Sequence, residues 1–406
     1  MTHNALFVGI DVSKLKHDIA IINEQKKLVR KPFVIKDSYN GYQYLLGIFN
    51  QLQQNHEIQT FRIGLEATSD YWKNLYYFLK KQSDDFIVTV INPIQTKAFA
   101  KAELRRASTD SVAARDIARF MVEKQPQPSI DKSPSFDCIK DLDGMLYAVK
   151  KQLTMTTNKL RLELTKVAPE IEKDVSYIKG MQILALLAQF PTAEAIDKAS
   201  VEQLSQVHYG KNNWSLPLNY IRNMKQLAKN SIAYKTGPGA GYIVQSLVRR
   251  TIEAQQEIER LNQQLVEQYQ RVNQHESLLT SIPGISKETA VVLEAYIGDV
   301  NRFANARKIV AYFGMNPTID DSGTSKHRKG HLQKKGSGIV RHKLYMAILS
   351  MIRFKNGPIY NYYNRLVESG KHKLVAMAAA MRKLLVIIYH MLKNQQEFDP
   401  DKVTYD

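Results

Sequence analysis

Cysteine is almost absent from this chain of 406 residues, which contains only Cys138. A lone thiol cannot form an intrachain disulfide or a cysteine-type zinc site, so we expect it to serve as an ordinary small apolar residue. The ten histidines show no spacing typical of zinc ligands. No uninterrupted apolar run approaches the roughly 20 residues that span a bilayer, and the N-terminus lacks the basic and apolar segments of a secretion signal. These absences predict a cytoplasmic protein with no membrane partner.

Acidic residues are few relative to basic ones, 39 against 57, which gives a formal net charge of +18. Such a surface attracts polyanions through counterion release. Nucleic acid is therefore the expected partner, although charge alone does not separate a nucleic-acid-binding protein from one that is merely basic. The hydrophobic share of 44% and the charged share of 24% are typical of a folded globular chain.

The first 125 residues alternate between strand-like and helix-like segments. Strands are expected at residues 5–11, 17–22, 33–35, 61–66 and 86–91. Helices are expected at residues 41–54 and 71–81 and after Asn92-Pro93. This order predicts an α/β domain over residues 1–125. Three prolines between Lys124 and Ser135 then mark a boundary.

The rest of the chain reads as mainly helical. Apolar residues at helical spacing in residues 137–172 and 243–277 predict two long helices that pair as an antiparallel coiled coil, within a spacer over residues 135–277. The glycines between 237 and 241 predict a hinge or turn. A mostly helical domain is expected over residues 278–406, with core helices at 339–354 and 371–393. Its helix-hairpin-helix-like turn at 282–285 is either a phosphate-binding turn or a plain packing corner.

Three carboxylates stand where an RNase H-like α/β fold would place them. Asp11 ends the first predicted strand, Glu66 ends a later strand and Asp110 opens a predicted helix. Hard oxygen ligands of this kind bind Mg²⁺, or the similar Mn²⁺, together with phosphate oxygens. Two such ions about 4 Å apart can activate a nucleophile and stabilise the leaving oxygen in phosphoryl transfer. One acid at a strand end is common by chance, but three in this element order predict a catalytic metal site.

Several short motifs occur together at the two ends of the chain. The N-terminal motifs are VGIDVSK at residues 8–14, GLEAT at 64–68, NP at 92–93 and TD at 109–110. The C-terminal motifs are IPGI at 282–285, YFGMNP at 312–317, SG at 322–323 and KGSGIVR at 335–341. In combination they resemble the DEDD transposases of the insertion-sequence family IS110, which also includes the Piv-type DNA invertases.

This resemblance implies an RNase H/RuvC-like fold for the N-terminal domain. It also implies a magnesium-dependent transposase that cleaves and rejoins donor and target DNA, guided by a structured bridge RNA. The protein would be a homo-oligomer, dimer to tetramer, in the bacterial cytoplasm and associated with the nucleoid. The family's serine nucleophile matches Ser322, with Ser325 as a close alternative. Basic side chains nearby would hold phosphates and neutralise developing charge; they are Lys326, Arg328, Lys329, Lys334, Lys335 and Arg341.

One position departs from the family pattern. The family has a fourth acid three residues after the third, where this chain has Ala113. Asp116 lies nearly one helical turn further along, so it is a candidate for the fourth metal ligand and catalytic acid. Alternatively, Asp116 is a surface acid and the site is a variant or an inactive one.

Two rival functions stay open on the sequence. The first is a structure-specific nuclease that uses only the carboxylates, and such an enzyme would still cut DNA after Ser322→Ala. The second is a catalytically inactive regulator that binds nucleic acid, which the alanine at position 113 favours. A metal-binding titration separates this second function from an enzyme.

Overall fold

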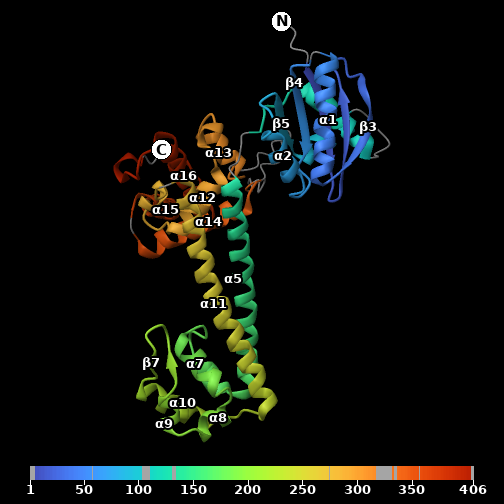
Figure 1. Cartoon of the computed structure of the whole chain (residues 1–406). Helices are drawn as coiled ribbons and strands as arrows, with labels where there is room; N and C mark the ends of the chain where they lie inside the picture. The colour runs from blue at the N-terminus through green and yellow to red at the C-terminus, as the bar shows by residue number, and fades with distance from the viewer. Residues whose placement is uncertain are drawn as a thin grey trace, which may run out of the picture. The chain divides into compact units, whose positions relative to one another are not determined.

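The computed structural model describes residues 5–56, 58–102, 110–129, 134–273, 275–316, 332, 336–355 and 357–403. The chain divides into two compact units, residues 1–131 and 132–406 (Figure 1). The division between the units falls in the proline-containing segment that the sequence marks as a boundary. The predicted boundary at residue 278 lies inside the second unit, so the division into three domains stays a prediction.

A five-stranded sheet forms the centre of the first unit. Its spatial order is β3-β2-β1-β4-β5. β2 runs antiparallel to both of its neighbours, β1 and β3, whereas β4 and β5 run parallel to β1. The strands are β1 (Ala5–Val12), β2 (Lys16–Ile22), β3 (Leu28–Lys36), β4 (Thr60–Glu66) and β5 (Phe86–Ile91). The strands predicted at residues 5–11, 17–22, 61–66 and 86–91 are therefore confirmed.

Helices cover both faces of this sheet, because the buried strands carry apolar side chains on both faces. The unit's helices are α1 (Tyr39–His56), α2 (Trp72–Lys80), α3 (Pro93–Ala102) and α4 (Asp110–Lys124). On one face Val8 and Ile10 of β1 belong to a core shared with α1 and α2. On the other face Phe7 belongs to a smaller core with α3 and α4. Asp11, two strand positions beyond Gly9 and four beyond Phe7, therefore lies on the α4 face.

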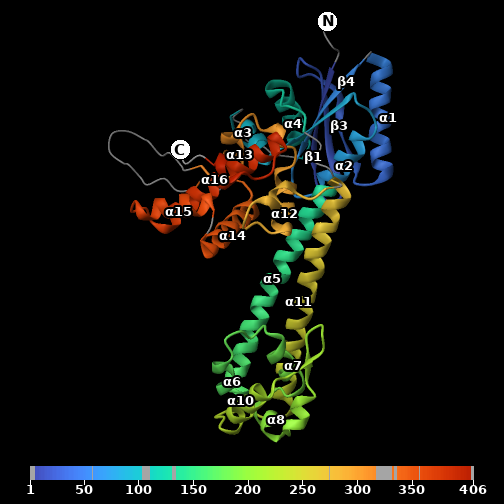
Figure 2. The same ribbon diagram turned by 90° about the vertical axis from the view of Figure 1, so that its left-hand side faces the viewer.

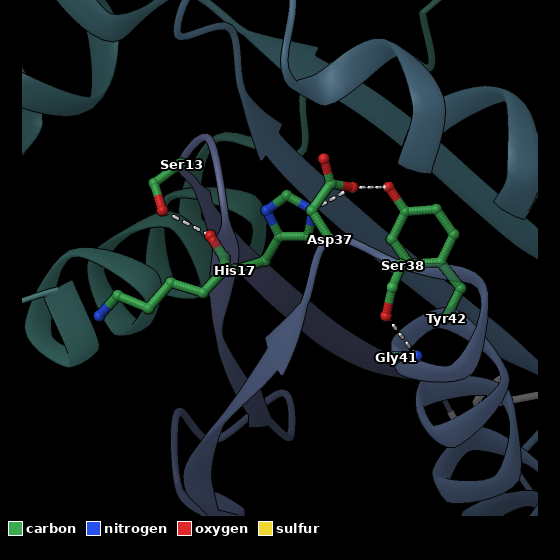
Figure 3. A network of polar contacts seen from close by, with 7 residues as sticks. Ser13, His17, Asp37, Ser38, Gly41 and Tyr42 are labelled. Atoms are coloured by element: carbon green, nitrogen blue, oxygen red, sulfur yellow. Dashed lines mark hydrogen bonds and ion pairs between the residues drawn. The ribbon is translucent and has the colours of Figure 1, made fainter.

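The strand β3 is longer than the sequence pattern indicates. Only residues 33–35 read as a strand, but β3 runs from Leu28 to Lys36 because it pairs along almost all of β2. A cluster of polar side chains fixes the end of β3 to α1 (Figure 3). The buried ring of His17 lies 3.3 Å from an Asp37 carboxylate oxygen, and the Tyr42 hydroxyl donates to the same oxygen. This cluster lies on the α1 face, opposite Asp11.

Two long helices, α5 (Pro134–Val167) and α11 (Pro238–Asn273), lie side by side and antiparallel in the second unit, as both views show (Figures 1 and 2). Both helices were expected, but α11 begins five residues earlier than the pattern indicates. Pro238 stands at its first position, where a proline costs no intrahelical hydrogen bond. Gly237, with a φ of +88°, makes the turn before it. Cys138 is exposed on α5 rather than packed in a core.

Short elements connect α5 to α11 at one end of the pair. They are α6 (Pro169–Asp174), α7 (Met181–Gln189), α8 (Ala193–Lys198), α9 (Val201–Ser205), β6 (His208–Tyr209), β7 (Trp214–Ser215) and α10 (Leu218–Lys229). They pack around their own apolar core with the adjoining ends of α5 and α11. Among these short helices β6 and β7 form a small hairpin.

Helices again gather at the other end of the pair. They are η1 (Leu278–Ser281), α12 (Lys287–Ile297), η2 (Val300–Arg302), α13 (Ala306–Tyr312), α14 (Gly338–Phe354), α15 (Pro358–Glu368), α16 (Lys373–Asn394) and η3 (Pro400–Lys402). By length and composition α16 could cross a membrane, but half of its apolar stretch is buried in the core of this unit. A buried ion pair joins α14 to α5, with Lys343 Nζ 2.6 Å from an Asp143 carboxylate oxygen.

Candidate active site

The ends of β1 and β4 place two of the predicted acids side by side. In the parallel pairing of these strands Gly9 lies opposite Gly64 and Ile10 opposite Leu65. Asp11 and Glu66 are the next residues on each strand, so they stand at the same level at the carboxyl end of the sheet. Parallel strands therefore deliver both carboxylates to one edge.

Two glycines allow α4 to bring the third acid to this edge. A Cβ atom added to Gly9 would lie 2.0 Å from the Ala114 carbonyl oxygen and 2.3 Å from the Ala118 nitrogen. A Cβ atom added to Gly64 would lie within 3.0 Å of three side-chain atoms, of which two come from α4. The missing side chains create the space in which the α4 backbone contacts the sheet. Asp110 opens this helix and is thereby held near the strand ends.

The electrostatics of Asp11 reflect this convergence. The pKa of Asp11 is raised from 3.8 to about 6, first by burial and then by the negative charges of Glu66 and Asp110. Asp18 raises it further, whereas Lys16 opposes the increase. Like charges held together favour the protonated form of an acid or the binding of a cation. The structure thus brings Asp11, Glu66 and Asp110 into one negatively charged site.

The Glu66 carboxylate is oriented by hydroxyl groups. Thr96 of α3 donates a hydrogen bond from Oγ1 to Glu66 Oε2 at 2.7 Å. Thr68 donates to Glu66 Oε1 at 3.4 Å. Hydrogen bonds of this kind fix the orientation of a carboxylate, as they do for carboxylate ligands of metals.

Lys16 lies among these acids. Its ammonium group is 3.1 Å from Asp110 Oδ2 and 3.5 Å from Asp18 Oδ2. Asp18 was not among the acids chosen from the sequence, because its strand reads only as an apolar segment between polar ends. The register of the hairpin, in which Asp11 pairs with Asp18, is the signal that identifies it.

The donor chemistry of the site fits a divalent metal. Carboxylate oxygens are the ligands that Mg²⁺ and Mn²⁺ prefer. Burial, and after it the negative charges of Glu66 and Asp110, raises the pKa of Asp11. Within the described ranges, no three histidine, cysteine, aspartate or glutamate side chains are arranged closely enough to hold a metal ion. The fit therefore rests on donor type and charge.

Asp116 lies further from this group of acids along α4. It is six residues after Asp110, is 7% exposed, and is not among the charges that act most strongly on Asp11. The alternative interpretation of Asp116 as a surface acid is therefore wrong, since the residue is buried. Its role as a metal ligand stays a prediction.

The predicted serine nucleophile and most of its basic neighbours fall outside the described residues; these are Ser322, Ser325, Lys326, Arg328, Lys329, Lys334 and Lys335. Arg341 is described and donates from Nη1 to the carbonyl oxygens of Phe313 and Gly336, at 3.1 and 3.2 Å. Gly336 has a φ of +111°, and a Cβ there would lie 2.2 Å from the Tyr312 carbonyl oxygen. Arg341 thus joins the two segments that flank the serine region, and its predicted contact with phosphate stays a prediction.

A turn lies between η1 and α12, at the place where the sequence predicts a helix-hairpin-helix-like turn. Gly284 has a φ of +92°. A Cβ atom added to Gly284 would lie 2.9 Å from Met351 Cγ of α14. Ser286 caps α12 by accepting a hydrogen bond from the Thr289 nitrogen. These contacts support the packing-corner interpretation, and a phosphate contact at this turn is left as a prediction.

Comparison with known proteins adds a second line of argument. Residues 8–169 match a family model for the DEDD domain of IS110 elements, described as a transposase. Residues 276–364 match the model described as transposase of the IS116/IS110/IS902 family. With its acids gathered at the end of an α/β sheet, the protein is a DNA-processing enzyme of the transposase class. The chain belongs to the IS110 family of transposases and DNA invertases, as its motifs predicted.

Relatives of similar length support this placement. The chain is 23% identical over 395 residues to the pilin gene-inverting protein of Moraxella bovis, with 97% of each chain covered. It is 20% identical over 410 residues to the 44.8 kDa protein of insertion element IS116 from Streptomyces clavuligerus, with 98% and 97% covered. It is 23% identical over 296 residues to the 43.6 kDa protein of IS110 from Streptomyces coelicolor, with 73% and 71% covered.

Proposed function

We propose that this transposase cleaves and rejoins DNA strands with a metal-dependent carboxylate site and a serine nucleophile, under the guidance of a structured RNA. The observation that carries the proposal is the convergence of Asp11, Glu66 and Asp110 at one end of the sheet. The strand order, with three antiparallel strands followed by two parallel ones, supports an RNase H/RuvC-like fold for this unit. The paired helices α5 and α11 are proposed as the coiled coil that assembles the oligomer.

Each group has a defined task in this proposal. Asp11, Glu66 and Asp110 bind Mg²⁺ or Mn²⁺, which when bound polarises a phosphate oxygen and stabilises negative charge. The Ser322 hydroxyl oxygen forms a bond to phosphorus as the bond from phosphorus to a deoxyribose oxygen breaks. The hydroxyl proton leaves to a base, and the departing oxygen takes up a proton. Attack by a DNA hydroxyl on the serine phosphodiester reverses the step, so strand exchange needs no nucleotide cofactor.

The net charge of +18 supports DNA and RNA as partners. The basic side chains around the serine, from Lys326 to Arg341, are proposed to hold phosphates. The guide RNA, the oligomer of two to four subunits and a place in the bacterial cytoplasm, at the nucleoid, remain parts of the proposal that the family suggests.

A strand-exchange assay tests the chemistry. The substrate is a plasmid that carries the gene of this protein with its flanking DNA, incubated with the full chain and the RNA that copurifies with it. We expect Ser322→Ala to abolish both recombinant DNA and the covalent protein–DNA adduct seen on denaturing gels, with Ser325→Ala as the matched control. Asp11→Asn should abolish cleavage as well. Cutting that survives Ser322→Ala would identify a nuclease, and a wild-type protein that neither binds Mn²⁺ nor cuts DNA would identify a regulator.

The RNA has its own test. The protein is purified from cells that express the gene with its flanks, and the bound nucleic acid is sequenced. We expect one structured RNA encoded beside the gene, and we expect ribonuclease treatment to stop strand exchange. Random cellular RNA, or exchange that resists ribonuclease, would refute RNA guidance and leave the chemical proposal intact.

A further inference from the structure

Position 113, where the family pattern places a fourth acid, is alanine in this chain. An RNase H-like site with three carboxylates is therefore short of one oxygen donor, unless another element supplies it. Among the residues that the structure describes, Asp18 on β2 and Asp116 on α4 are the candidates for this donor.

Asp18 stands beside Asp11 in the sheet. The two residues are directly opposite each other in the antiparallel pairing of β1 and β2. Opposite residues of an antiparallel pair project to the same face, with Cβ atoms about 5 Å apart. Asp18 therefore shares the α4 face with Asp11, whereas its neighbour His17 lies on the α1 face with Asp37 (Figure 3).

The surroundings of Asp18 show that its carboxylate borders a position that accepts a cation. Asp18 is 8% exposed, which is low for an acidic residue. The Lys16 ammonium lies 3.5 Å from Asp18 Oδ2 and 3.1 Å from Asp110 Oδ2. A positive charge thus lies between an acid of β2 and an acid of α4, within reach of the same negative site that surrounds Asp11.

Asp116 is placed less favourably. Six residues of α-helix separate it from Asp110, which corresponds to about 9 Å along the helix axis, against about 4.5 Å for position 113. Its side chain lies on the buried side of α4 next to Ile117 in sequence.

We infer that Asp18 is the fourth carboxylate of the metal site, in place of the acid missing at position 113, and that Lys16 occupies the cation position until a divalent metal displaces it. This inference rests on the proposed metal-dependent function. Lys16 then acts as a positioning residue, because it holds Asp18 and Asp110 near each other in the metal-free protein. After displacement its ammonium is free to contact a phosphate.

Equilibrium binding of Mn²⁺ to the full chain tests the inference, with the free ion counted by electron paramagnetic resonance and no DNA present. We expect Asp18→Asn to weaken Mn²⁺ binding at least about tenfold, as loss of a metal-site carboxylate does. Asp11→Asn is the reference for a lost ligand. Asp37→Asn is the matched control, since it removes an acid from the opposite face of the same sheet and should leave the affinity within about twofold.

Two further variants decide between the candidates. Asp116→Asn should leave the affinity within about twofold of wild type. Lys16→Met should raise the affinity about threefold or more, because the metal no longer competes with a resident cation. This second readout stays decisive even where Asp18→Asn lowers the thermal stability of the unit.

The outcomes separate this inference from the function on which it rests. Wild-type affinity in Asp18→Asn, or unchanged or weaker binding in Lys16→Met, overturns the role of Asp18 and Lys16 while Asp11→Asn still shows a metal site. A loss confined to Asp116→Asn assigns the fourth position to α4. Absence of saturable Mn²⁺ binding by the wild-type chain refutes the metal-dependent function and the inference together.

Discussion

Replacing Asp11 by asparagine should stabilise the metal-free first unit while it destroys the proposed metal site. The pKa of Asp11 is raised to about 6 by burial and by the charges of Glu66 and Asp110. A change from 3.8 to about 6 corresponds to roughly 3 kcal/mol at about 1.36 kcal/mol per pH unit. Because the group is only partly buried, solvent screening reduces the usable figure to about 1–2 kcal/mol.

The sign and the pH range follow from linkage. A carboxyl whose pKa is higher in the folded than in the unfolded state binds its proton more tightly when folded, so folding is penalised once the unfolded chain loses that proton. The penalty is absent below pH 3.8, grows as the pH rises, and is complete above about pH 6. Asp11→Asn should therefore raise the stability at pH 8 and leave it nearly unchanged at pH 3.5.

Thermal unfolding in the presence of a chelator measures this effect. The chain has two tryptophans, so a Trp214→Phe background leaves Trp72 to report on the first unit. We expect Asp11→Asn to melt about 4–8 °C higher than the background protein at pH 8. Mg²⁺ should then stabilise the background protein and leave the variant unaffected. An equal or lower melting temperature for the variant at pH 8 would show that the acids do not repel one another in the folded unit.

Four other substitutions test packing and charge in the two units. Gly9→Ala should destabilise the first unit by about 1–3 kcal/mol in thermal melts, because the new Cβ overlaps α4, whereas Gly47→Ala in open space on α1 should stabilise it by about 0.5–1 kcal/mol. Asp143→Asn leaves Lys343 buried without its counter-charge, and we expect a loss of about 3–5 kcal/mol in denaturant unfolding of the second unit. Burial lowers the pKa of His17 below 6.5. The unfolded chain therefore takes up this proton first, and the stability of the first unit falls as the pH drops below 6.5. His17→Asn should make the melting temperature depend less on pH between pH 7 and pH 5.

The acids at the ends of β1 and β4 were predictable, because two local signals coincide there. An apolar run of strand length locates the strand, and the carboxylate that follows locates its end. Parallel pairing then brings Asp11 and Glu66 together without further information. Asp110 was predictable in the same way, as the acid that opens a helix.

Asp18 and Lys16 were not predictable from local patterns. Asp18 is a buried acid near the start of an otherwise mainly apolar strand, and its importance depends on the register between two strands. The contact of Lys16 with Asp110 joins residues 94 positions apart. The length of β3 shows the same limit. Its residues alternate only weakly between buried and exposed, and the strand extends because it forms hydrogen bonds to β2.

The fold holds acids together where their charges repel one another, and this repulsion destabilises the metal-free unit. Gly9 and Gly64 give up side-chain packing so that α4 can approach the sheet, and Asp110 reaches the site through that approach. Lys16 compensates part of the charge with one ammonium shared by two carboxylates. A single positive charge against four acids leaves a negative remainder, which is the condition under which a divalent cation binds. The proposed metal would relieve this repulsion, and the opposite effects expected for Asp11→Asn with and without Mg²⁺ follow from that proposal.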